Sequence, residues 1–209
     1  MNKSLAALAL FLVAAHQGQA VAASSVELIV KGLITPSACT PTLSANGIVD
    51  HGKLSAKDLN QGTPTDLPAV TLQMNVNCDA QTLFGLNGND NRASSAIVAT
   101  GYGLGLIDNT QKIGTYHLEL VNPVADNVAV IPLESNNGGQ TWSAIDGEYW
   151  YSGNLAGFGG VSGGLYVPVP IQDLTTDLAV MTQIAPAQDL NLSNEVSLDG
   201  SATIEVKYL

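Results

Sequence analysis

The stretch Ser24–Cys39, SSVELIVKGLITPSAC, decides the fold. Apolar residues recur in it at every second position, with a glycine taking one place in the row: Val26, Leu28, Val30, Gly32 and Ile34. Polar residues occupy alternate positions at Glu27, Lys31 and Thr35. A period of two residues predicts an extended strand with one face meant for burial.

A second alternating segment lies at the other end of the sequence, in Ser201–Leu209. Its apolar positions are Ala202, Ile204, Val206 and Tyr208. The same period predicts a strand here, so both ends of the exported chain are predicted to be extended.

Residues 1–23 have the three parts of a secretory signal peptide. A cation at Lys3 precedes an unbroken apolar run from Leu5 to Ala15, and small residues follow. We predict cleavage after Ala20, with cleavage up to Ala23 as an alternative. A retained membrane anchor would need an apolar run of about 18 residues or more, so we expect export.

The chain carries 7 cations and 18 anions, a formal charge of 7 − 18 = −11. Loss of Lys3 with the signal peptide makes this 6 − 18 = −12. Such an acidic chain repels phosphate groups, which argues against nucleic acid and anionic membrane as partners. The length suits one buried core and does not require two domains.

Two cysteines are present, Cys39 and Cys78. In an exported protein a pair favours a disulfide, with two free thiols as the weaker alternative. Cys78 shares its parity with the apolar residues of Val70–Cys78, which favours a structural bond in a buried face. The spacing of the cysteines from His51 and His117 fits no usual zinc site, and we expect neither metal nor cofactor.

The middle of the chain reads as many short strands separated by glycine, asparagine and proline. Strands are predicted at 48–54, 70–78, 83–86, 96–100, 102–107, 116–120, 128–132, 142–145, 149–151, 165–171 and 178–184. Beyond the signal peptide, no window shows the 3.6-residue period of a capped helix. This pattern predicts an all-β antiparallel sandwich or barrel.

Residues 156–164, AGFGGVSGG, are rich in glycine, which predicts either a mobile loop or closely packed backbones. They contain the letters of a G-x-S-x-G nucleophile elbow. That elbow requires a helix after it and a later histidine, whereas a strand is predicted next and no histidine follows His117. We therefore expect no enzymatic activity.

Aromatic residues gather between positions 142 and 158, with Trp142 and Trp150 as the largest. If exposed, these two rings could stack on sugar rings, so they are candidate glycan contacts. The alternation of Tyr149, Trp150 and Tyr151 along a strand sends at least one of the rings toward the core.

Several motifs together give the chain its resemblance to a known family. Cys39 comes seven positions after Gly32, and residues 49–54 read VDHGKL. The predicted strand Val70–Cys78 contains the second cysteine, and Tyr208 is the penultimate residue. In this order, behind a signal peptide, they resemble a pilin-type fimbrial subunit of the chaperone–usher pathway. The extra length between Cys78 and Gly164 is similar to that of a less studied fimbrial-like branch.

The resemblance implies an incomplete immunoglobulin-like β-sandwich that lacks its last strand. Residues 24–35 would be an N-terminal donor strand and 36–209 the pilin-type domain. The donor residues would be Val26, Leu28, Val30, Gly32 and Ile34. The edge that receives a chaperone, and later a neighbouring donor strand, would be lined by Ile204, Val206 and Tyr208.

The implied function is that of a structural subunit of a surface fimbria, assembled by donor-strand complementation. The implied partners are a periplasmic pilus chaperone, an outer-membrane usher and neighbouring subunits, with passage through the periplasm to the cell surface. The alternative is an adhesive minor or tip subunit that binds a glycan through Trp142 and Trp150.

Overall fold

The computed structural model describes residues 28–31, 38–145 and 147–209. The chain has two compact units, Met1–Ile34 and Thr35–Leu209. In the first unit, residues 28–31 have no regular secondary structure, and the side chains of Leu28 and Val30 are exposed. The predicted signal peptide and the predicted donor residues Val26, Gly32 and Ile34 lie outside the described residues.

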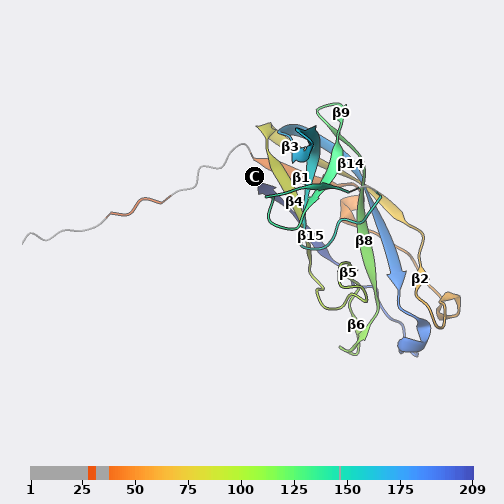
Figure 1. Cartoon of the computed structure of the whole chain (residues 1–209). Helices are drawn as coiled ribbons and strands as arrows, with labels where there is room; N and C mark the ends of the chain where they lie inside the picture. The colour runs from red at the N-terminus through yellow and green to blue at the C-terminus, as the bar shows by residue number, and fades with distance from the viewer. Residues whose placement is uncertain (1–27, 32–37, 146) are drawn as a thin grey trace, which may run out of the picture. The chain divides into compact units, whose positions relative to one another are not determined.

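The second unit is all-β, with two open sheets of antiparallel strands (Figure 1). The larger sheet has the order β1-β3-β14-β8-β5. Its strands are β1 (Cys39–Leu43), β3 (Val70–Thr82), β14 (Ile171–Ile184), β8 (Gly114–Ala125) and β5 (Tyr102–Gly103), joined by β2 (Thr65–Asp66) on β14 and β9 (Val128–Ala129) on β8.

The other sheet has the order β11-β10-β12-β4-β15. Its strands are β11 (Ser143–Ala144), β10 (Ile131–Ser135), β12 (Leu155–Ser162), β4 (Phe84–Asp90) and β15 (Ala202–Tyr208), with β13 (Leu165–Pro168) on β12. A separate hairpin joins β6 (Leu106–Ile107) to β7 (Gln111–Lys112). The predicted β-sandwich is confirmed.

Helical structure in the described part of the chain is limited to short 3₁₀ turns. They are η1 (Ser44–Gly47), η2 (Ala56–Asp58) and η3 (Ala187–Asp189). Across those same described residues, no helix has both the length and the apolar character needed to cross a bilayer.

The core forms between the sheets because the long strands alternate in polarity. In β3, the side chains of Leu72, Met74, Val76 and Cys78 are buried, and the residues between them are half-buried or exposed. Burial of each such side chain contributes about 1.5–3 kcal/mol relative to exposure. The predicted parity of Val70–Cys78 is therefore confirmed, and the strand continues to Thr82.

Four local predictions are wrong or need correction. Residues 48–54 form no strand, and the strand predicted over 96–100 is replaced by bends and turns at 97–100. Residues 149–151 form no strand either, but only an isolated bridge between Trp150 and Leu118. The glycine-rich residues 156–164 lie mostly in β12, where the backbone of β13 approaches so closely that a Cβ on Gly159 would meet the Val167 carbonyl oxygen at 2.0 Å. The close-packing interpretation is correct, and the mobile-loop interpretation is wrong.

Candidate functional site: the groove between β1 and β15

Two edge strands from different sheets define the site. In the described structure β1 pairs only with β3, and β15 pairs only with β4. β1 and β15 lie close together at one end, where the Cys39 amide donates to the Tyr208 hydroxyl over 3.1 Å. Each strand therefore presents backbone donors and acceptors that its own sheet leaves unpaired.

A groove with a volume of about 1320 Å³ lies beside these edges. Its floor is made of core side chains from the larger sheet: Leu72, Met74, Leu118, Leu178 and Val180. One wall is β1 with the segment Asn46–Leu54, and the other is the segment Leu190–Ile204, which ends in β15. An apolar floor between two strand-like walls suits an extended segment with one apolar face.

The second wall is longer than the predicted strand Ser201–Leu209. Side chains that line the groove continue from β15 back through Leu198, Val196, Leu192 and Leu190. These residues share the parity of Ala202 and Ile204. No element is predicted for 190–200, although the alternation Leu190, Leu192, Val196, Leu198 was visible in the sequence as a signal for this wall.

The backbones of the two walls are available over much of their length. Among the residues that the structure describes, neither Val49–Leu54 nor Leu192–Leu198 makes a backbone-to-backbone hydrogen bond. Gly52 and polar side chains interrupt the first segment, polar side chains interrupt the second, and the described fold supplies neither with a neighbouring strand. An extended ligand in the groove would have partners for its backbone on both sides.

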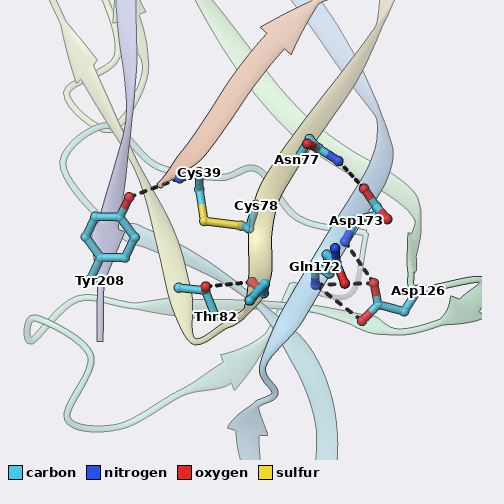
Figure 2. The surroundings of a disulfide bond; sticks show 9 residues. Cys39, Asn77, Cys78, Thr82, Asp126, Gln172, Asp173 and Tyr208 are labelled. Carbon is cyan, nitrogen blue, oxygen red and sulfur yellow. Dashed lines mark hydrogen bonds between the residues drawn. A yellow bond between two sulfur atoms is a disulfide. The ribbon is translucent and has the colours of Figure 1, made fainter. Parts of the chain in front are cut away.

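The predicted disulfide between Cys39 and Cys78 is formed and fixes the first wall (Figure 2). It joins residues that are opposite each other in the β1–β3 ladder. β1 has five residues and one ladder partner, so the covalent bond holds a strand that the sheet alone would hold weakly. The bond is typical of proteins from oxidising compartments.

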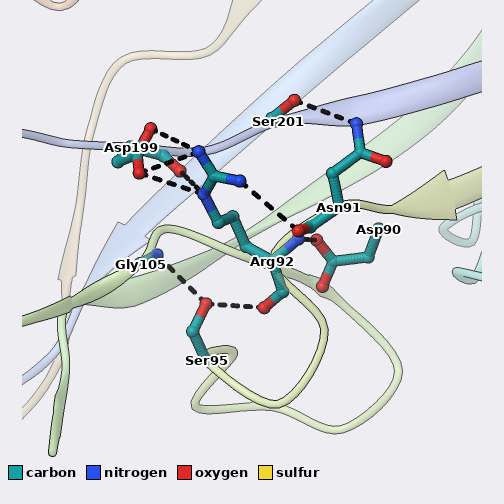
Figure 3. Close-up of polar contacts among 7 residues, drawn as sticks. All are labelled: Asp90, Asn91, Arg92, Ser95, Gly105, Asp199 and Ser201. Carbon is teal, nitrogen blue, oxygen red and sulfur yellow. Dashed lines mark hydrogen bonds and ion pairs between the residues drawn. The ribbon is translucent and has the colours of Figure 1, made fainter. Parts of the chain in front are cut away.

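The second wall is fastened by Arg92, which lies after β4 (Figure 3). Its guanidinium donates to both carboxylate oxygens of Asp199, over 3.0 and 2.9 Å, and to the Asp199 carbonyl over 3.1 Å. This contact lowers the pKa of Asp199 and raises the pKa of Arg92. The Asn91 amide donates to the Ser201 carbonyl over 2.9 Å, so the chain is held just before β15 begins.

The residues predicted to line the acceptor edge fall into different places. Ile204 lines the groove. Val206 is half-buried and packs against the core opposite Leu86 of β4. Tyr208 is 40% exposed and uses its hydroxyl to tie β15 to the start of β1, so it closes one end of the groove.

Polar residues surround the groove, and the sequence did not predict that they would lie there. The His51 Nε2 atom lies 2.9 Å from the Thr182 hydroxyl, which anchors the first wall to β14. Lys53 and Glu195 come from opposite walls, and their charged groups are 3.7 Å apart. Both side chains are almost fully exposed, so this ion pair contributes little to stability.

The predicted glycan contact at Trp150 is wrong because this side chain is fully buried. Its indole N–H donates to the Asn154 carbonyl over 2.9 Å inside the core. Trp142 is half-buried on the other sheet, where its ring lies against Gly157 so closely that a Cβ there would meet it at 2.6 Å. Trp150 therefore packs in the core, and the Trp142 ring packs against the backbone of β12 at Gly157.

Trp150 also closes the side of the sandwich away from β1 and β15. Its amide donates to the Leu118 carbonyl of β8 over 2.8 Å, and the Gly153 amide donates to the Gly88 carbonyl of β4 over 2.9 Å. The segment between Trp150 and Gly153 therefore bridges the two sheets. Tyr149 lies beside it and stacks on His117, with 4.2 Å between ring centroids.

The chain is similar to known proteins whose descriptions name no activity. Residues 28–101 match the model of a family described as "Protein of unknown function (DUF1120)". The chain is similar to Protein GltF of Escherichia coli strain K12, with 28% identity, 94% of this chain and 93% of the relative covered. It is also similar to Uncharacterized protein YhcF of the same organism, with 27% identity over 91% of this chain and 93% of the relative.

Proposed function

We propose that this chain is a structural subunit of a surface fimbria, assembled by donor-strand complementation. The observation that carries the proposal is the groove between β1 and β15, which has an apolar floor and unpaired backbone on both walls. The occupant would be residues 24–35 of a neighbouring copy, and a periplasmic pilus chaperone would occupy the groove before it. An outer-membrane usher would organise the exchange, and no catalytic turnover is expected.

The donor segment is no longer than the wall that would receive it. The second wall, Leu190–Ile204, would span about 50 Å if fully extended, and an extended Ser24–Thr35 spans about 40 Å, at ~3.3 Å per residue. The side chains of Leu28 and Val30 are exposed, so they are accessible to a partner. Burial of four aliphatic side chains of the donor would contribute about 6–12 kcal/mol before the cost of ordering the segment.

Charge and covalent chemistry support the same setting. An acidic, exported chain with a disulfide suits the periplasm and the cell surface. An apolar groove exposed during transit would aggregate unless another chain covered it. A dedicated chaperone is the simplest solution to that hazard, which is why it belongs to the proposal.

Removal of the apolar row tests the donor assignment. Val26, Leu28 and Val30 are replaced together by serine, with Ser24→Ala/Ser25→Ala as the matched control in the same segment. Both variants are co-expressed with the candidate chaperone and usher. The triple variant should still co-purify with the chaperone, because its own groove is intact, but it should form no fibres or heat-resistant multimers. Fibres at the control level would show that residues 24–35 are not the donor.

A further inference from the structure

Asparagine is followed by glycine at three places in the sequence, Asn46–Gly47, Asn87–Gly88 and Asn137–Gly138. In such a pair the backbone nitrogen of the glycine can attack the side-chain carbon of the asparagine, and glycine hinders this approach least because it has no Cβ. The reaction requires an asparagine side chain that is free to turn and a backbone that can rotate between the two residues. The fold therefore decides which of the three pairs reacts.

The pair at Asn87 is protected by its place inside a sheet. Asn87 lies in β4 between two ladders, opposite Leu155 of β12 and Glu205 of β15. Its carboxamide donates to the Asn89 side-chain oxygen over 3.0 Å, and Gly88 is buried. Rotation of the backbone at this position would disturb the ladders on both sides.

The pair at Asn137 lies in an exposed turn, but the asparagine side chain is held by its neighbours. Its carboxamide oxygen accepts hydrogen bonds from the Ser135 hydroxyl over 2.8 Å and from the Thr141 amide over 3.0 Å. Its carboxamide nitrogen donates to the Thr141 hydroxyl over 2.7 Å. These contacts must open before the side-chain carbon can turn toward the Gly138 nitrogen.

The pair at Asn46 has neither kind of protection. Asn46 and Gly47 are exposed and belong to η1, the turn between β1 and the rest of the first wall of the groove. Within the part of the chain that the structure describes, the Asn46 carboxamide makes no hydrogen bond. Its side-chain carbon is therefore free to turn toward the next residue.

The backbone of this turn is strained in the direction that favours rotation. Ala45 and Asn46 have φ values of 49° and 53°, in the left-handed region, and Gly47 has a φ of 71°. This region is unfavourable for alanine, whose Cβ lies too close to the following carbonyl oxygen. Rotation out of it releases strain, which offsets part of the cost of opening the turn. The same rotation brings the Gly47 nitrogen toward the Asn46 side chain.

We propose that Asn46 is the main deamidation site of this chain and that its conversion alters the first wall of the groove. The inference does not rest on the proposed function. The Gly47 nitrogen forms a bond to Cγ of Asn46 and gives up its proton, the bond from Cγ to Nδ2 breaks, and ammonia leaves with that proton. Water then opens the cyclic imide at either of its two carbonyl carbons, which yields aspartate or isoaspartate.

Both products change the groove, because Asn46 belongs to its lining and a carboxylate replaces the neutral amide there. Isoaspartate also adds a methylene carbon to the backbone of the turn. The start of the turn is held to β3, since the Gln73 amide donates to the Ser44 hydroxyl over 2.8 Å. In the described structure Val49–Leu54 makes no backbone-to-backbone hydrogen bond, so the added length shifts this segment first.

The test follows all three asparagines in the same molecules. The full exported chain, folded and oxidised, is kept in mildly alkaline buffer, and samples are reduced, digested with trypsin and mapped by mass spectrometry. Trypsin releases residues 32–53, in which Asn46 is the only asparagine. Asn46 should convert at least about tenfold faster than Asn87 and Asn137, because those two require prior local opening. In urea, with the disulfide reduced, the three rates should become similar.

Two outcomes would overturn the assignment of the site. One is conversion of Asn137 as fast as that of Asn46 in the folded chain, and the other is the same preference for Asn46 in urea, which would mean that the fold does not select it. Asn46→Gln should remove the acidic species that anion-exchange chromatography separates from the aged chain. Asn137→Gln is the matched control and should leave that species in place.

The effect on the wall has its own readout. The isoaspartate form is purified, and the imidazole signals of its histidines are compared with those of the fresh chain by NMR. His51 lies in the first wall with its Nε2 atom 2.9 Å from the Thr182 hydroxyl, so its signals should shift. His117 stacks on Tyr149 away from this wall, and its signals should stay in place. Unchanged His51 signals would overturn the effect on the wall and leave the modification site standing.

Discussion

The two lateral sides of the sandwich differ in whether another segment of the chain covers the gap between the sheets. On the β8 side, Trp150 pairs with Leu118, fills the core with its ring and leads into a segment that reaches Gly88 of the other sheet. On the β1 side, β1 and β15 approach each other at the Cys39–Tyr208 end but do not pair, and the groove with its apolar floor lies beside them. One sandwich thus has one covered side and one open side.

This difference is one of the observations that support the proposed binding of another chain on the open side. On the other side, the segment around Trp150 covers the edge of the sandwich. On the open side no described segment does so, and the Cys39–Cys78 disulfide and the Arg92–Asp199 contact instead fix the walls of the groove. Fastened walls beside an uncovered apolar floor are what a binding site requires, since ordering the walls in advance lowers the cost of association.

The largest expected effect concerns the covered side. Trp150→Ala should lower the free energy of unfolding by about 3–5 kcal/mol, because it leaves a large cavity and removes the bridge between the sheets. Trp142→Ala is the matched control, since that ring is only half-buried, and it should cost less than half as much. Urea unfolding followed by circular dichroism measures both. Equal losses would show that the covered side does not depend on Trp150.

The next effect concerns the first wall of the open side. Cys39→Ala/Cys78→Ala should lower the free energy of unfolding by about 2–4 kcal/mol, as expected for a crosslink with a sequence separation of 39. Urea unfolding of the unmodified chain under dithiothreitol should match that of the double variant without it. A double variant as stable as the oxidised chain would mean that the β1–β3 ladder holds this wall without help.

Much of the fold followed from parity in the sequence, and the reasons for the failures are physical. The alternation of Leu72, Met74, Val76 and Cys78 predicted a buried strand. The prediction is correct because the chain supplies both strands, β1 and β14, that β3 needs as hydrogen-bonded neighbours. Residues 48–54 alternate as well, yet they form no strand, since a strand needs a hydrogen-bonded neighbour and the described structure provides none there. The prediction failed at the position where the groove begins.

The candidate site was predictable in part. The motif around Ile204 indicated an edge strand, and the groove beside it agrees with that expectation. The extension of the wall to Leu190 was missed because asparagine, serine and glutamate between the apolar residues read as a loop. Burial of Trp150 could not be inferred from the sequence. Alternation places Trp150 on the opposite face from Tyr149 and Tyr151, but it does not say which of the two faces is buried.

The open side should tolerate loss of apolar volume better than the core. Ile204→Ala should lower the free energy of unfolding of the isolated chain by about 1 kcal/mol, because Ile204 is only half-buried at the edge. Leu86→Ala, on the adjacent strand and fully buried, should cost about 3 kcal/mol. The two variants should rank in the reverse order for binding of a synthetic Ser24–Thr35 peptide, since Ile204 lines the groove and Leu86 does not contribute to its lining. The same ranking in both assays would argue that Ile204 serves only the core.

The smallest effect is a pH dependence at the turn between β8 and β9. The Asp126 carboxylate accepts hydrogen bonds from the Asp173 amide over 2.8 Å and from the Gln172 amide over 3.2 Å, and these hold its pKa below the ordinary value of 3.8 (Figure 2). A carboxyl with a lowered pKa in the folded state stabilises the fold above its unfolded pKa, and this contribution is lost as the pH falls through the folded value.

Asp126→Asn should therefore be less stable than the unmodified chain at pH 7, with a difference that disappears as the pH falls below 3.8. Asp58→Asn, which removes the same charge from the exposed turn η2, is the charge-matched control. Urea unfolding at a series of pH values measures both differences, and a constant Asp126→Asn difference across the series would mean that the carboxylate is not what pins this turn to β14.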